Sequence, residues 1–111
     1  MPPMTINAVA FQKGSLWIAQ CLEYDIVSYA ETPEKLVEEL TGQLESLVDF
    51  NLAAGREAFA GFSPAPERYW RLFEEARAQV KPIEPKRHLR EKLSRFLGRP
   101  MVTPRLFFAS A

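Results

Sequence analysis

Cysteine and histidine are nearly absent from this chain of 111 residues, which contains only Cys21 and His88. A single cysteine cannot form an internal disulfide, and one Cys and one His do not provide the spacing of a zinc site. A nucleophilic Cys–His pair is also disfavoured, because Cys21 lies in an apolar stretch and His88 lies in a distant basic segment. We therefore expect Cys21 to be a small core side chain in a protein of a reducing compartment.

Long apolar runs and recognisable catalytic motifs are missing as well. No stretch approaches the roughly 20 apolar residues that span a bilayer, and the first residues lack the basic and apolar regions of a secretory signal. No phosphate-binding loop, dinucleotide fingerprint or nucleophile elbow occurs. The sequence predicts a cytoplasmic protein without a membrane span, with no enzymatic activity and with no cofactor or metal.

Charge is present in equal amounts of each sign but is unevenly distributed. Residues 1–64 carry three basic and nine acidic side chains, whereas residues 65–111 carry eleven basic and five acidic ones. Such polarity suits head-to-tail self-association or an acidic partner approached by the basic half. A small core also favours association, so we expect a homo-oligomer.

Three short strands are predicted in the first thirty residues. Residues 6–11 and 16–22 are rich in β-branched and aromatic side chains, and Gly14 supplies the positive φ of a tight hairpin turn. Residues 26–29 predict a third antiparallel strand after the polar bend at residues 23–25.

Helical signals dominate the middle of the chain. Thr32 and Pro33 mark a helix start, apolar residues then recur at three- and four-residue steps, and Gly55 is a plausible stop. The spacing predicts a second helix over 67–80 and a short third helix over 89–97. Residues 105–109 are expected either to add a strand to a sheet edge or to dock on a neighbouring subunit.

The predicted fold is thus α+β: a three-stranded antiparallel sheet with one long packed helix, followed by a helical C-terminal extension. Residues 1–55 would form the sheet–helix domain. Residues 56–111 would form the basic extension, packed on the same domain or on a neighbouring subunit.

The order of three strands and a long helix carries a family resemblance. With residues 17–27 (WIAQCLEYDIV) and 31–36 (ETPEKL), residues 5–53 resemble the HicB-like antitoxin fold, a partial double-stranded-RNA-binding-domain topology. The resemblance implies a module that binds a protein partner, in that family a small ribonuclease toxin, and that self-associates. The alternative interpretation is a nucleic-acid-binding protein that uses its basic C-terminal helix.

The candidate partner-binding residues follow from apolar or aromatic character and from charge. Trp70 falls off the main apolar stripe of its helix, a position typical of protein interfaces. Glu23 and Asp25 could share a divalent cation, but a solvated bend explains them better. The candidate set is Trp70, Lys86, Arg87, Arg90, Lys92, Arg95, Arg99, Leu106, Phe107 and Phe108.

Overall fold

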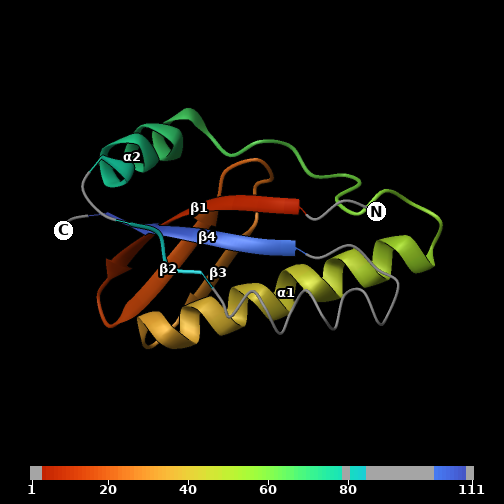
Figure 1. Ribbon diagram of the computed structural model, residues 1–111, viewed down its shortest axis with the longest axis horizontal. Coiled ribbons are helices and arrows are strands. Elements are labelled where there is room, and N and C mark those ends of the chain that lie inside the picture. The colour runs from red at the N-terminus through yellow and green to blue at the C-terminus, as the bar shows by residue number, and fades with distance from the viewer. Residues whose placement is uncertain (1–3, 79–80, 85–101, 110–111) are drawn as a thin grey trace.

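The computed structural model describes residues 4–78, 81–84 and 102–109. A mixed four-stranded sheet lies between a long helix and a short one (Figure 1). The strand order is β3-β2-β1-β4. The elements along the chain are β1 (Met4–Lys13), β2 (Leu16–Cys21), β3 (Val27–Ala30), α1 (Pro33–Ala53), α2 (Glu67–Arg77) and β4 (Val102–Phe108).

The first three strands form the predicted antiparallel meander. Gly14 has a φ of 63° in the turn between β1 and β2, so this part of the prediction is confirmed. Opposite residues include Ala10 with Ala19 and Phe11 with Ile18. β3 pairs with the other side of β2 and forms one edge of the described sheet.

The predicted α+β class is confirmed, but the sheet has four strands instead of the three antiparallel strands in the predicted fold. Residues 102–108 form β4, which pairs parallel to β1 and makes the sheet mixed. Outside β4, Ile83 exchanges backbone hydrogen bonds with Leu106 at 2.8 and 3.0 Å. Backbone groups alternate in direction along a strand, so the nitrogen of Pro104, like that of Leu106, faces the outer side. Pro104 lacks an N–H, but the pairing of β4 with β1 therefore loses no hydrogen bond.

The start of α1 is confirmed where the sequence predicts it. The hydroxyl oxygen of Thr32 accepts a hydrogen bond from the Lys35 backbone N–H at 3.1 Å, and Pro33 is the first helical residue. The helix ends at Ala53, and Gly55 follows with a φ of 76°. One stripe of α1 is buried against the sheet, and it consists of Leu36, Val37, Leu40, Thr41, Leu44, Val48 and Asn51.

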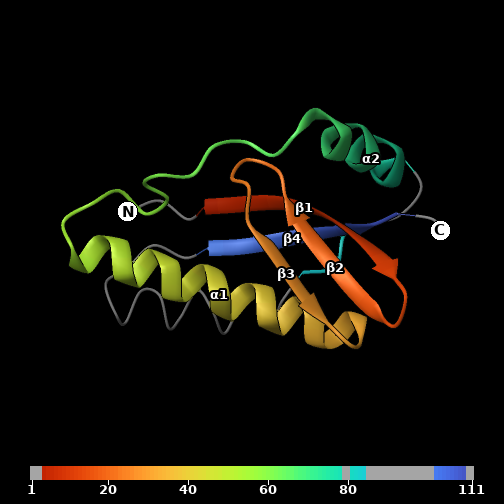
Figure 2. The same cartoon turned by 180° about the vertical axis from the view of Figure 1, so that it is seen from behind.

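α2 covers part of the opposite face of the sheet. Phe73 and Ala76 are buried against Val9 of β1 and Phe107 of β4, and the Phe73 and Phe107 rings meet edge to face at 5.1 Å. α2 packs mainly over β1 and β4, whereas β2 and β3 lie nearer the viewer in Figure 2. The sheet therefore has a core on each side, a larger one under α1 and a smaller one under α2.

Residues 54–66 connect the two helices and pass the bend at residues 22–25. The Asp25 N–H donates to the Ser63 carbonyl at 2.6 Å, and the Ala65 N–H donates to the Leu22 carbonyl at 2.9 Å. Tyr24 stacks on the buried Phe59 with ring centroids 4.3 Å apart. These contacts fix the bend next to the beginning of β3.

The predicted second helix ends at Arg77 instead of continuing to residue 80. The predicted helix over 89–97 lies outside the described residues. Within the described part of the chain, no helix combines the length and the apolar character needed to cross a membrane.

Candidate interaction surface

The C-terminal apolar residues of the candidate set belong to the fold. Leu106 is 0% exposed and Phe107 is 3% exposed, so neither reaches a partner while β4 stays in the sheet. Phe108 is half-buried and meets the Trp17 ring edge to face at 5.6 Å. The structure thus has the first of the two expected arrangements, in which this segment adds a strand to its own sheet. The basic candidates Lys86, Arg87, Arg90, Lys92, Arg95 and Arg99 lie outside the described residues.

Trp70 is half-buried at the edge of the smaller core. Its indole Nε1–H donates to the Ala65 carbonyl at 3.2 Å, and its ring meets Phe73 edge to face at 6.5 Å. The side chain therefore secures the first turn of α2 against the preceding loop. A partner could therefore contact only the exposed half of the Trp70 side chain.

The carboxylates of the bend are held by local hydrogen bonds. Glu23 accepts from the Asn7 backbone N–H at 2.7 Å and from the Asn7 side chain at 2.9 Å. Asp25 accepts from the Gln20 amide at 2.7 Å. No group of three or more Cys, His, Asp or Glu side chains converges within the described ranges. The carboxylates of Glu23 and Asp25 thus support the bend through these hydrogen bonds.

Cys21 is fully buried under α1, in agreement with its expected role as a core side chain. Burial raises the pKa of the Cys21 thiol to about 12, and the nearby Glu23 carboxylate contributes in the same direction. The thiol is thus neutral at physiological pH, and a thiolate nucleophile is not available at this position.

An apolar hollow of about 500 Å³ lies where β1 begins and α1 ends. A small-molecule site usually combines such a hollow with a few convergent polar groups. Among the described residues that line it, Glu57 supplies the one carboxylate and Tyr24, whose ring stacks on Phe59, supplies the one phenol. The lining residues are Met4, Tyr24, Leu52, Glu57, Ala58, Phe59, Ala60, Gly61 and Phe62.

A more distinctive surface lies on β2 and β3, on the side of the sheet away from α1. We call the side chains of Leu16, Ile18, Val27 and Tyr29 the open face. Leu16 is 38% exposed, Val27 is 47% exposed and Tyr29 is 67% exposed. The register places Tyr29 beside Ile18, and Ile18 in turn beside Phe11 of β1, so the apolar row continues toward α2. Phe11 itself is stacked under Tyr69.

The backbone of β3 is open along the same margin. The Cys21 N–H donates to the Ile26 carbonyl at 2.9 Å. This bond determines which residues of β3 direct their backbone groups toward β2. In an antiparallel ladder the bonded pairs alternate, so Ser28 and Ala30 bond to β2. Val27 and Tyr29 therefore direct their N–H and C=O groups away from the sheet. Among the described residues, no other strand pairs with this edge.

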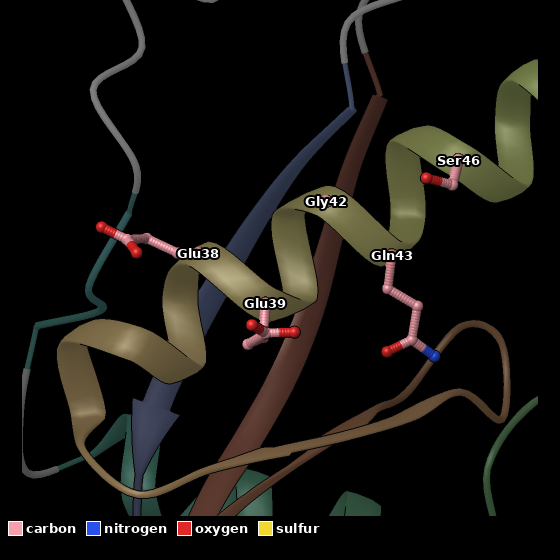
Figure 3. A pocket seen from close by; sticks show the side chains of 5 residues that line it. All are labelled: Glu38, Glu39, Gly42, Gln43 and Ser46. Carbon is pink, nitrogen blue, oxygen red and sulfur yellow. The ribbon is translucent and has the colours of Figure 1, made fainter.

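α1 contributes an acidic border to this edge. Glu38, Glu39, Gly42, Gln43 and Ser46 line a shallow hollow of about 470 Å³ on its outer face. Figure 3 shows Gln43 reaching toward the strands below, Glu38 directed to the opposite side of the helix, and Glu39 between the two. The Gln43 amide donates to the outward carbonyl of Val27 at 3.2 Å. The border and the β3 edge thus form one continuous surface.

Sequence reasoning did not identify the β3 edge. The signal was present in residues 27–30 (VSYA), which contain two large apolar side chains on one face and neither lysine nor proline. Natural edge strands commonly carry such protective residues. The strand order was the missing information, because a sequence pattern does not tell which strand is outermost.

Comparisons with protein-family models, curated proteins and solved structures find no match for this chain.

Proposed function

We propose that this chain is a small, non-enzymatic interaction module of the HicB-like type that binds a protein partner in the cytoplasm. The observation that carries the proposal is the open face next to the unpaired edge of β3. A contiguous patch of large, exposed apolar side chains often marks an interaction site, whereas single exposed apolar residues do not. A protein partner fits such a surface because it can bury apolar side chains and satisfy backbone groups together.

The arrangement of the first 53 residues supports the choice of family. Three antiparallel strands precede one long helix, in the order on which the resemblance was based. By that resemblance the partner is a small ribonuclease toxin, encoded next to this chain. Self-association belongs to the same proposal, since the opposed charges of the two halves allow head-to-tail contacts.

A co-expression assay tests this function. If an adjacent small reading frame arrests growth when expressed alone, co-expression of this chain should restore growth and the two proteins should co-elute. Tyr29→Ser should abolish the rescue, because it removes the most exposed aromatic ring of the open face. Phe50→Ser is the matched control, because Phe50 is an exposed aromatic residue on α1. Failure of the wild-type chain to rescue growth or to co-elute would reject the toxin partner.

Nucleic-acid binding is the alternative function, favoured by the excess of basic side chains in residues 65–111. Affinity for arbitrary DNA or RNA should then fall steeply with salt. Replacing Arg90, Lys92 and Arg95 with glutamine should weaken binding equally for all sequences and flatten the salt dependence. Loss of preference for one sequence with general affinity retained would contradict a purely electrostatic role.

A further inference from the structure

We propose that the β3 edge is a strand-addition site for an extended, basic segment of a protein partner, and that Gln43 occupies one of its hydrogen-bonding positions in the free protein. The inference rests on the proposed function, because it locates and describes the partner contact of the same module. Three independent features of the described residues meet at this edge: the direction of the backbone groups, the Gln43 contact and the surrounding charge.

The backbone directions define what can bind. Val27 and Tyr29 offer two N–H donors and two C=O acceptors along one line, in the spacing of a β-ladder. An added strand satisfies such groups without any change in the sheet. Its alternate side chains would lie against the open face, where Val27 and Tyr29 are exposed.

Gln43 and an added strand would compete for the same backbone carbonyl of β3. The side chain comes from α1, and its amide donates to the Val27 carbonyl that an added strand would use. Gln43 is itself exposed and not otherwise enclosed, so it can leave the carbonyl by a rotamer change. A net hydrogen bond is worth about 1 kcal/mol, so displacement costs little.

The surrounding charge selects the occupant. Residues 25–55 contain seven acidic side chains and a single basic one, Lys35. Asp25 precedes β3, Glu31 follows it, and Glu39 lies on α1 one turn before Gln43, with Glu38 farther around the helix. This field attracts lysine and arginine and repels phosphate, which excludes nucleic acid as the occupant of this particular edge.

A second copy of β3 is a poorer occupant than a basic segment. Antiparallel pairing centred on Ser28 would bring Asp25 close to Glu31 of the copy. The acidic faces of the two α1 helices would also approach one another. Like charges placed opposite each other across a ladder are destabilising.

Amide hydrogen exchange provides the first test, with a short synthetic peptide of alternating valine and lysine as the probe. In the free protein, the amides of Val27 and Tyr29 should exchange quickly and those of Ser28 and Ala30 slowly. The peptide should slow exchange at Val27 and Tyr29. A peptide with proline at consecutive positions lacks the N–H donors on both of its edges and should not bind. Equal exchange rates along β3, or binding of both peptides, would overturn strand addition.

Variants then test the backbone direction, the Gln43 contact and the charge one at a time. Tyr29→Pro removes an outward N–H that the β2–β3 ladder does not use, so it should bind the peptide about tenfold more weakly than Tyr29→Ala. Gln43→Ala frees the Val27 carbonyl and should bind roughly two- to tenfold more tightly. A merely structural Gln43 would not give tighter binding. Replacing Glu38 and Glu39 with glutamine should weaken binding and reduce its salt dependence.

The remaining outcomes distinguish this site from the broader function. If Tyr29→Pro keeps its fold and still rescues growth in the co-expression assay, the interaction module stands and the β3 site is wrong. If Tyr29→Pro turns an oligomer into a monomer and the peptide does not bind, the occupant is a second copy and the basic partner is wrong.

Discussion

Replacing Phe107 with alanine should destabilise the protein severely, because β4 is a core strand and not a docking tail. Phe107 is 3% exposed and meets Phe73 edge to face at 5.1 Å. Truncation of a buried phenylalanine costs about 3–5 kcal/mol, out of a total stability of roughly 5–15 kcal/mol for an ordinary domain. With a urea m value of about 2 kcal/mol/M, the unfolding midpoint should fall by roughly 2 M.

The matched control is Phe50→Ala, since Phe50 is 66% exposed. Its unfolding free energy should change by no more than about 0.5 kcal/mol. The Phe107→Leu variant keeps most of the apolar volume and should lose under about 1.5 kcal/mol, so it remains measurable if Phe107→Ala does not fold. Any dependence of the urea midpoint on protein concentration should be the same in these variants as in the wild type.

Two results would refute this reasoning. A Phe107→Ala midpoint as high as that of Phe50→Ala would mean that the ring is not in the core. A midpoint that rises with protein concentration in the wild type but not in Phe107→Ala would mean that β4 is supplied by another copy of the chain, because association stabilises by mass action.

Three further predictions concern individual positions. Thr32→Ala should lower the unfolding free energy by about 1 kcal/mol in thermal denaturation, and Thr32→Ser should restore it, because the hydroxyl caps α1. Gly14→Ala should lower the unfolding free energy by roughly 1–2 kcal/mol, because Gly14 has a φ of 63°. Gly42→Ala, on the exposed face of α1, should raise it by about 1 kcal/mol. A change of the same sign in both variants would contradict the argument. The neutral Cys21 thiol has its pKa raised from 9.0 to about 12, so its contribution to stability is complete below pH 9 and is lost as the pH rises toward 12. Cys21→Val should remove that part of the pH dependence of unfolding while leaving partner binding intact.

Local signals in the sequence were sufficient for the first half of the fold. Gly14, Thr32 and Gly55 each determine the conformation of their own few residues, so the hairpin and the long helix could be predicted. β1 nevertheless extends two residues beyond the predicted range 6–11 at each end. The third strand was placed one residue early, because Ile26 continues the apolar pattern although its carbonyl belongs to the bend. Such small shifts arise where a strand begins within a hydrogen-bonded turn.

The fourth strand could not be placed for a different reason. Pairing of β4 with β1 joins residues at opposite ends of the described chain, and no local pattern encodes that choice of neighbour. Pro104 also hides the beginning of the strand, because proline is normally a sign of a strand boundary. The direction of its ring away from β1 becomes evident only when the register is known. The β3 edge was missed as a candidate site on the same ground, since an outermost strand is a property of the whole sheet.

The parallel pairing of β1 with β4 has a consequence for biosynthesis. β1 leaves the ribosome before every other described element, and its neighbour β4 leaves after all of them. Until then β1 has one unpaired edge, and Leu106 and Phe107 are missing from both cores. Folding that depends on such distant contacts is slow, and the nascent chain is exposed to aggregation in the meantime. We therefore expect the sheet to be completed only after β4 has been synthesised.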